Sequence, residues 1–456
     1  MMTIPRSVIR AVRTVVRRAA VGRSRHVSPS IWFVPEPRAV LVRAGIGEGV
    51  IQYRVPTDSP GRDVVALTLA DLERIEGPRD DRVTLELAGP QSVRATWTDR
   101  GVPRALTLAS VPNPPPTVAE PANWVAQPLA FLSALHEATR STSREPARYA
   151  LHRLQFQGRY GTVVGTDGRH ATLYGGFAFP FAEDLLIPAS PVFGARDWHD
   201  AESVALARTD TQIVLRAGSW TLALDIDRES RFPDVRGIIP RTATPTTLTI
   251  SEADAIALRD RLGSLPGAND DSQPITLDLE PGRLGVIRAQ GSDAEPPVEW
   301  RLSSSWVENG PSRIALDRTW LQRAVMLGCR TVQVVGVGQP IVAGAGAITL
   351  VTIGLDASCR VAPSASVIPL DIPLSLPSTP MKILPGPAVS PVSSEPPEPL
   401  DPLAEAEALK AMLTDAANRA SRLVQRLKQS RKQKRVLESA WTALQSLKLG
   451  ATPAGV

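Results

Sequence analysis

The sequence predicts an α+β protein of three repeated domains, followed by a proline-rich linker and a long C-terminal helix. Three observations lead to this fold class. Apolar residues recur at strand and helix spacing up to residue 358. The order helix, strands, short helix, strands occurs three times, at a period of roughly 115 to 125 residues. Beyond Asp356 the composition shifts to Pro, Ser and Val. A chance recurrence of a common α+β pattern is the alternative explanation of the repeat.

The first unit spans residues 1–118 and begins with a helix over 4–20. Val8, Val12 and Val15 fall on one face of this helix at helical spacing, and arginines fill much of the remainder. A proline-rich segment closes the unit. Further elements are predicted as a short helix over 69–75 and strands over 30–34, 39–45, 49–55, 82–89, 92–99 and 105–111.

The same order returns in a second unit, residues 122–241, and in a third, residues 246–358. A helix is expected over 127–140 in the second unit, and the third unit begins with a helical segment within 246–265. Shorter helices are expected near 189–198 and over 316–328, and strands over 150–158, 161–168, 170–179, 203–209, 212–218, 220–227, 275–282, 283–291, 298–305, 330–338 and 347–356.

The last part of the chain has a different character. Residues 361–402 are rich in Pro and Ser and are predicted to form an extended linker. Residues 403–449 carry leucines and alanines at alternating spacings of three and four, a heptad pattern that Ser430 and Lys434 interrupt within a basic run. The pattern fits a coiled coil, a basic arm for nucleic acid, or a solvated helix packed on its own protein.

Composition narrows the class of protein. The net charge is +5 and arginine supplies most of the cationic groups, which points weakly to a polyanionic partner; a GC-rich genome would give the same bias. The two cysteines, Cys329 and Cys359, exclude a disulfide scaffold and a cysteine-based zinc site, and favour a reducing cytoplasm. No apolar run is long enough for a membrane span. The acid-free, arginine-rich first 35 residues also fit a transit peptide.

None of the catalytic motifs that we considered indicates an enzyme. Asp167 and His170 lie three residues apart, which suits acid–base chemistry, but Asp-Gly between two apolar runs is a hairpin signal. The glycines of 336–346 lack the strand-to-helix context of a dinucleotide site. Nucleophile-elbow, phosphate-loop and zinc-protease motifs do not occur in the sequence. We therefore expect a non-catalytic protein without cofactor or metal.

Several segments resemble a known family. The stretch "RYALHRLQFQG", followed by "GTVVGTDGRHATL", resembles the middle domain of the bacterial sliding clamp, the β subunit of DNA polymerase III. The later stretch "RFPDVRGIIP" resembles the segment that closes that domain. The first and third units match by pattern, so that the resemblance covers residues 3 to about 356 in the family's order.

The resemblance implies DNA-clamp domains with helices lining an inner face and antiparallel sheets outside. Two chains would close head-to-tail into a homodimeric ring around double-stranded DNA. The ring would act in DNA replication as a processivity factor for a replicative polymerase, placed on DNA by a clamp loader, in the cytoplasm with the nucleoid. The alternative is a clamp-fold paralogue that no longer tethers polymerase and serves as a DNA-binding or protein-interaction scaffold through its C-terminal helix. An unrelated α+β enzyme is the third hypothesis.

A sliding ring should contact phosphates without reading bases, through mobile cationic side chains. The helices then offer candidate DNA contacts, and further positions follow from the resemblance alone: Arg23, Arg148 and Tyr149. The candidates on or near the helices are Arg6, Arg10, Arg13, Arg17, Arg140, Arg144, Arg259 and Arg261.

The family also binds short apolar peptides between its second and third domains. In this sequence Arg169-His170 stands where His-Arg is usual, and Ala171 replaces a larger aliphatic residue, which weakens an apolar groove. The usual Met-Pro-Met ending corresponds to "TIGLD" here. The resemblance places the pocket at Leu151, Thr166, Gly168, Arg169, His170, Ala171, Pro240, Leu350 and Thr352.

The junction at 228–241 is predicted to fix the angle between the second and third units. Phe232 and the pair Ile238-Ile239 would anchor it in neighbouring cores, because large apolar side chains favour burial. The two prolines of the junction would stiffen it, and Asp234 would pair with a nearby arginine.

Overall fold

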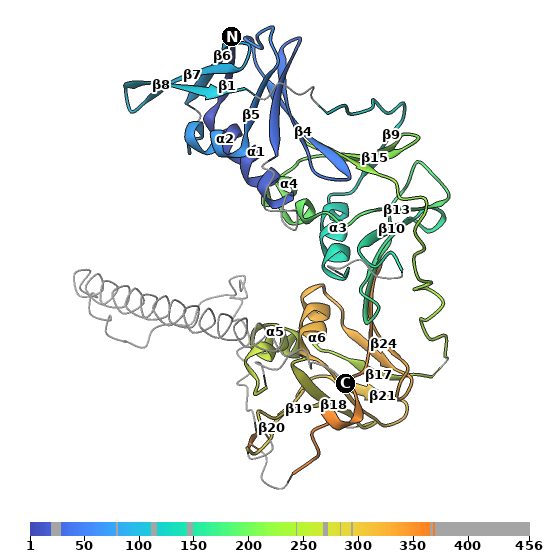
Figure 1. Ribbon diagram of the computed structural model, residues 1–456. Coiled ribbons are helices and arrows are strands. Elements are labelled where there is room, and N and C mark those ends of the chain that lie inside the picture. Colours follow the sequence, from blue (N-terminus) through green and yellow to red (C-terminus); the bar gives the residue numbers. More distant parts are fainter. Residues whose placement is uncertain are drawn as a thin grey trace, which may run out of the picture. The chain divides into compact units, whose positions relative to one another are not determined.

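The computed structural model describes residues 1–19, 29–78, 81–110, 116–143, 149–242, 244–267, 272–282, 284–292, 295–364 and 368–369. The chain divides into two units, Met1–Pro377 and Ser378–Val456, and the second lies outside the described residues. The predicted helix over 403–449 and most of the predicted linker over 361–402 therefore stay predictions. Figure 1 shows the described part and labels many of its elements.

The first repeat contains a short strand, a helix, four strands, a second helix and three strands. Its first helix begins at Arg6 rather than residue 4, because Met2 and Ile4 are buried in a strand that pairs with β6. Thr68 caps its second helix, because the Thr68 hydroxyl accepts the N–H of Asp71 in a capping box. The elements are β1 Met2–Pro5, α1 Arg6–Ala19, β2 Ser30–Glu36, β3 Ala39–Gly45, β4 Gly49–Pro56, β5 Val65–Thr68, α2 Leu69–Ile75, β6 Arg82–Gly89, β7 Ser92–Asp99 and β8 Val102–Ala109.

The second repeat has the same order. The helix predicted from residue 127 begins later, at Ala130, since the preceding residues form strand β9 and Pro128 cannot donate to a strand ladder. The elements are β9 Trp124–Gln127, α3 Ala130–Arg140, β10 Arg153–Gln157, β11 Thr162–Thr166, β12 His170–Tyr174, β13 Asp184–Pro188, α4 Arg196–His199, β14 Val204–Arg208, β15 Gln212–Ala217 and β16 Trp220–Asp225, with 3-10 turns at Gly158–Tyr160 and Pro191–Gly194.

The third repeat adds one strand, β21, and is followed by a two-residue strand, β26, within the predicted linker. Ser251 caps its first helix by accepting the N–H of Asp254, and Asp317 caps its second by accepting the N–H of Thr319. The elements are β17 Thr246–Thr249, α5 Glu252–Arg261, β18 Pro274–Leu279, β19 Val286–Ala289, β20 Val298–Arg301, β21 Trp306–Glu308, β22 Ser312–Asp317, α6 Arg318–Met326, β23 Thr331–Val334, β24 Pro340–Ala345, β25 Ile348–Ile353 and β26 Ile368–Pro369, with 3-10 turns at Leu262–Ser264 and Ala357–Cys359.

Each repeat builds two half-sheets of four strands, and in the third repeat β21 adds a fifth strand beside β17. The A half-sheet holds strands that lie between the two helices, in the orders β5-β2-β3-β4, β13-β10-β11-β12 and β22-β18-β19-β20. The B half-sheet holds the first strand and the three after the second helix, in the orders β1-β6-β7-β8, β9-β14-β15-β16 and β17-β23-β24-β25. The three repeats therefore share one topology as well as one element order.

Neighbouring repeats are joined edge to edge by these half-sheets. Strand β4 of the first A half-sheet pairs antiparallel with β16 of the second B half-sheet, from Gly49 opposite Leu224 to Tyr53 opposite Trp220. Strand β12 pairs with β25 in the same manner, from His170 opposite Thr352 to Tyr174 opposite Ile348. Two continuous sheets of eight and nine strands result.

A contact between a buried arginine and a carboxylate reinforces each joint, although Glu48 at the first joint is 55% exposed. At the first joint, Arg153 Nε lies 3.0 Å from Asp227 Oδ2, and its Nη2 lies 2.7 Å from Oε1 of Glu48 in the first repeat. At the second joint, Arg323 Nε on α6 donates to Glu137 Oε2 on α3 at 2.8 Å, and Nη1 donates to Ser141 Oγ at 2.8 Å. Breaking one partner of such a pair leaves the other charge buried without compensation.

The junction at 228–241 is held partly as predicted. Phe232 and Ile239 pack against a small core that contains buried Val235. The prediction for Ile238 is wrong, because this side chain is 50% exposed. Asp234 accepts the N–H of Gly237 at 2.9 Å and closes a local turn, in place of the expected arginine pair.

Arg236 supplies the polar anchor of the junction. Its Nε donates to Gln157 Oε1 at 2.5 Å, its Nη2 donates to Thr162 Oγ1 at 3.0 Å, and its guanidinium stacks 4.2 Å from the ring centre of Tyr160. The junction is thereby fixed to the second repeat by hydrogen bonds as well as by apolar burial.

Arg318, the first residue of α6, is buried completely. Its guanidinium donates to the backbone carbonyls of Gln273 at 3.1 Å, Leu265 at 2.5 Å, Pro274 at 3.2 Å, and also to that of Pro266. One side chain thus supplies donors to four backbone carbonyls in the segment that leads from α5 to β18.

Arg318→Met should lower the free energy of unfolding by about 3 kcal/mol or more, because the buried carbonyls lose their charged donor. Urea unfolding followed by circular dichroism measures this loss. The matched control is Arg196→Met, whose side chain is 92% exposed, and it should change stability by less than about 0.5 kcal/mol. Equal effects of the two variants would contradict the structural role of Arg318.

The second joint should also respond to pH. Burial by itself would raise the pKa of Glu137, but Arg323 and Arg140 lower this pKa below its ordinary value of 4.5. The ionised carboxylate therefore stabilises the fold above the unfolded-state pKa, and this contribution is lost as the pH falls through the folded-state pKa. The stability difference between wild type and Glu137→Gln should be largest near pH 7 and should shrink as the pH falls below the unfolded-state pKa in urea unfolding. A difference independent of pH would contradict the pairing.

Candidate nucleic-acid interface and peptide site

The exposed face of α1 carries free cationic side chains. Arg10 and Arg17 are exposed, seven positions apart and therefore on one side of the helix, with exposed Thr14 between them. The opposite side, which includes Ile9 and Val12, is buried. Arg18, also exposed, donates to the carbonyl of Pro191 in the second repeat at 3.0 Å.

Two other arginines of α1 are engaged inside the first repeat. Arg6 is 9% exposed, donates to the carbonyls of Ile75 at 2.9 Å and Glu76 at 2.7 Å, and lies 5.2 Å from the ring centre of Trp97. The expectation that Arg6 contacts DNA does not fit this burial. Arg13 forms two hydrogen bonds to the Glu76 carboxylate, at 2.5 and 2.7 Å, which raise the pKa of the arginine.

The candidate cations of the other repeats are partly neutralised. Arg140 lies 3.1 Å from Glu137, one helical turn earlier, and its side chain is 49% exposed. Arg259 pairs with its neighbour Asp260 at 2.7 Å, whereas Arg261 is exposed. Exposed positive charge is therefore concentrated on α1 among these helices. Tyr149 is 45% exposed, and Arg23, Arg144 and Arg148 lie outside the described residues.

The neutralising partners were missed at the sequence level for different reasons. Asp260 is adjacent to Arg259 in the sequence "RDR", and this signal was available. Glu76 lies 63 residues from Arg13, so that its role depends on the packing of α2 against α1. Figure 1 shows these two helices side by side.

Most of the peptide-pocket residues gather at the second joint, around the pairing of β12 with β25. His170 Nδ1 lies 2.8 Å from Thr352 Oγ1, and the N–H of Ile353 donates to the carbonyl of Arg169 at 3.3 Å. A Cβ built on Gly168 would lie 3.6 Å from Leu151 Cδ1. Four of the residues are buried by the protein itself and form a floor: Thr166, Ala171, Leu350 and Thr352.

The other pocket residues are more accessible. Gly168 and Arg169 are exposed, and Leu151, His170 and Pro240 are half-buried. Ala171 belongs to the same small core as Val235, against which Ile239, the neighbour of Pro240, packs. The structure therefore brings the β12–β25 residues together and places Pro240 next to a residue that contacts their core.

The hairpin predicted at Asp167 is present. Asp167 Oδ1 accepts the N–H groups of Arg169 at 2.8 Å and His170 at 2.6 Å, and Gly168 has φ of 91°. The aspartate is thus the polar group of a turn between β11 and β12. This geometry gives no support to acid–base chemistry at this pair.

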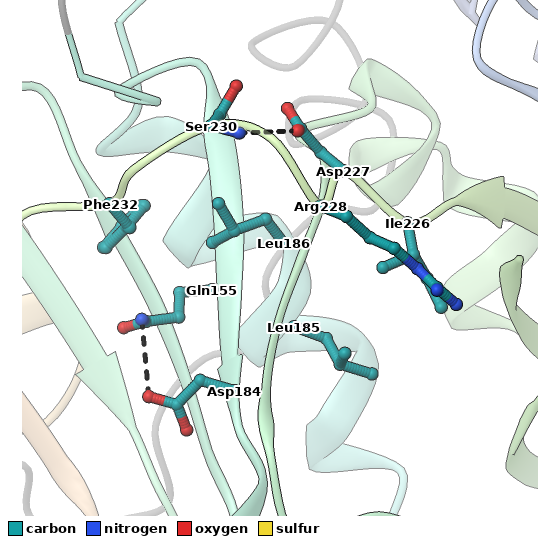
Figure 2. Close-up of a pocket in the computed structure, with 9 residues that line it drawn as sticks. All are labelled: Gln155, Asp184, Leu185, Leu186, Ile226, Asp227, Arg228, Ser230 and Phe232. Carbon is teal, nitrogen blue, oxygen red and sulfur yellow. Dashed lines mark hydrogen bonds between the residues drawn. The ribbon is translucent and has the colours of Figure 1, made fainter.

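A hollow of about 340 Å³ lies beside the junction on the second repeat. Figure 2 shows Asp227 hydrogen-bonded to the N–H of Ser230 at 3.0 Å, and Gln155 donating to Asp184 at 3.5 Å. Burial alone would raise the pKa of Asp227, but hydrogen bonds from Ser230 and Glu229 and the charge of Arg153 lower it. The carboxylates therefore serve the fold, and converging reactive groups are not seen in this hollow.

The described residues contain no cluster of three or more His, Cys, Asp or Glu side chains suited to a metal ion. Among the same residues, none of the helices has the length and apolarity needed to cross a membrane.

No protein-family model matches the sequence, and no curated protein matches it. Solved structures match closely in fold at low identity. The DNA polymerase III subunit β of Pseudomonas aeruginosa matches with a TM-score of 0.63 and 18% identity over 78% of this chain and 99% of its own. That of Borrelia burgdorferi gives 0.65 and 10% over 78% and 100%, and the β sliding clamp of C. crescentus gives 0.64 and 16% over 78% and 99%. The three repeats, joined edge to edge through their half-sheets, therefore have the fold of bacterial DNA polymerase III β subunits, the sliding-clamp fold.

Proposed function

We propose that two copies of this protein close head-to-tail into a ring around duplex DNA, and that the ring tethers a replicative polymerase without catalysing a reaction itself. The observation that carries the proposal is the repeated joint. In both internal joints the strand at one edge of an A half-sheet, β4 or β12, pairs with the last strand of the following repeat's B half-sheet, β16 or β25. Among the described residues, the same rule leaves β20 of the third repeat and β8 of the first repeat without such a partner.

These two edges are complementary under that rule. The β20 edge of one copy would receive the β8 edge of the other, and the second pair of edges would close the ring by symmetry. A head-to-tail contact gives a closed assembly when its rotation closes, and otherwise an open filament. Six equivalent repeats in a ring would then share one kind of joint.

The free edge of β8 can be assigned from its register. Strands β7 and β8 are joined by a two-residue turn at Arg100 and Gly101, both with positive φ, and the N–H of Ser110 donates to Gln91. Because bonded and non-bonded pairs alternate in an antiparallel ladder, the N–H groups of Ala105 and Thr107 point away from β7. Among the described residues no strand pairs with this edge.

The helix charges support contact with phosphates rather than with bases. Arg10 and Arg17 stand on an exposed helix face, and neither forms an ion pair with another described residue. Long cationic side chains of this type neutralise phosphates irrespective of sequence. Tethering of a polymerase is supported by the gathering of the peptide-pocket residues at the β12–β25 joint.

A clamp-fold scaffold that no longer tethers polymerase is the second candidate. The uneven charge favours it, since Arg259 is paired with Asp260 and α1 carries most of the free cations. The burial of Thr166 and Ala171, which leaves a small apolar surface at the peptide site, favours it as well.

Thr107→Pro tests ring closure, because proline removes an outward N–H of β8 without removing a bond to β7. The ring contains two such edges, so a loss of about 1 kcal/mol at each should raise the dimer dissociation constant roughly 25-fold. Sedimentation velocity measures the constant, and Thr107→Ala, which keeps the N–H, should behave as wild type. A dimer that tolerates proline here, or a wild-type chain that is monomeric at every accessible concentration, would exclude the proposed ring.

The double substitution of Arg10 and Arg17 by Gln tests the DNA contact. The slope of log affinity against log salt concentration should fall by about 2, since each lost phosphate contact contributes about 0.9. Replacing exposed Arg38 and Arg62 by Gln removes the same charge and should leave the slope unchanged. Protein bound to nicked circular DNA should in addition be released when the DNA is linearised. Retention on linear DNA, or equal slopes for both variants, would favour the scaffold.

A further inference from the structure

The chain that follows β25 crosses the A half-sheet of the third repeat from one edge to the other. The N–H of Leu355 donates to Ala315 on β22 at 2.8 Å, and the N–H of Val361 donates to Thr276 Oγ1 on β18 at 2.7 Å. The N–H of Ile368 then donates to the carbonyl of Pro297, next to β20, at 3.0 Å. In the strand order β22-β18-β19-β20, these contacts run from the first strand to the last.

The crossing ends as strand β26 on the edge that the proposed ring would use. Ile368 lies opposite Val298 and Pro369 opposite Glu299, so that β26 covers the first half of β20. Glu299 is held in turn by Arg288 at 2.9 Å and by Arg301 at 3.0 Å. The edge is therefore rigid and occupied by the chain's own C-terminal segment.

This pairing differs from both internal joints in ways that make it weaker. It is parallel and two residues long, whereas β4–β16 and β12–β25 are antiparallel with five residue pairs each. Ile368 remains 51% exposed, so the contact buries little apolar surface. Its strength rests mainly on main-chain hydrogen bonds, which contribute about 1 kcal/mol each.

We propose that β26 is a self-cap that competes with β8 of a second copy for the β20 edge, and so makes assembly of the ring conditional. This inference rests on the proposed ring. The capped chain satisfies the β20 edge and protects it from unspecific strand pairing. The longer antiparallel pairing with β8 replaces the cap when a second copy binds.

The cap lowers the apparent affinity between subunits by the fraction of chains whose β20 edge is open. A head-to-tail dimer contains two such edges, so the apparent affinity depends on the square of this fraction. A change in cap strength is thereby amplified in the measured dissociation constant. The capped form dominates at low protein concentration and the ring at high concentration.

Ile368→Pro tests the cap within the full-length chain, because it removes the N–H that binds Pro297. Loss of about 1 kcal/mol opens the edge roughly 5-fold, so the apparent dissociation constant should fall roughly 25-fold. Ile368→Ala keeps the N–H and is the matched control, with a constant close to that of wild type. Sedimentation velocity over a dilution series gives all three constants.

Hydrogen exchange of the monomers separates the two levels of the inference. In the capped chain the amides of Val298–Arg301 should exchange more slowly than in Ile368→Pro. If wild type and Ile368→Pro form dimers with equal dissociation constants, the competition is contradicted and the proposed ring is not. If the amides of Ile368→Pro exchange faster than those of wild type but neither protein dimerises, the cap is supported and the proposed ring is contradicted. If Ile368→Ala increases the dimer affinity as much as Ile368→Pro does, the role of the hydrogen bond is contradicted.

Discussion

The structure depends on the antiparallel pairing of β4 with β16 and of β12 with β25. An A half-sheet ends in a row of unpaired N–H and C=O groups, and an exposed row of this kind invites further pairing. The protein satisfies two of these rows with the B half-sheet of the next repeat, and the buried contacts of Arg153 and Arg323 lie at the same two joints. The position of each repeat relative to the next follows from strand pairing, and the ion pairs and the junction at 228–241 support it.

Local patterns predicted much of this fold, and long-range pairing could not be predicted from them. The helix over 69–75 was predicted with its observed bounds, because its apolar spacing is contained in seven consecutive residues. The turn at Asp167 was equally local. The first strands of the repeats were not predicted, and the helices were begun within them, since four residues such as Met2–Pro5 show too few alternations to reveal a strand. Apolar alternation also does not show which strand pairs with which, so neither joint could be predicted from the sequence. Strand β26 gave no strand signal, because it lies in a proline-rich segment.

Arginine has two roles that the sequence alone does not separate. Arg6 and Arg318 are the first residues of α1 and α6, and both place a buried guanidinium against backbone carbonyls. Arg10 and Arg17, a few positions from Arg6, face solvent instead. Part of the arginine content therefore serves loops without regular hydrogen bonding, because five fixed donors can satisfy several carbonyls at once. Only burial distinguishes these residues from candidates for binding a polyanion.

The attachment of β26 to the same chain as β20 has a consequence in time. A tethered strand remains at a high effective concentration near its site, however dilute the protein is. In the proposed ring, β26 would therefore compete for a vacated β20 edge at any protein concentration. Each opening would last as long as the cap stays bound, which gives a duplex time to enter or leave.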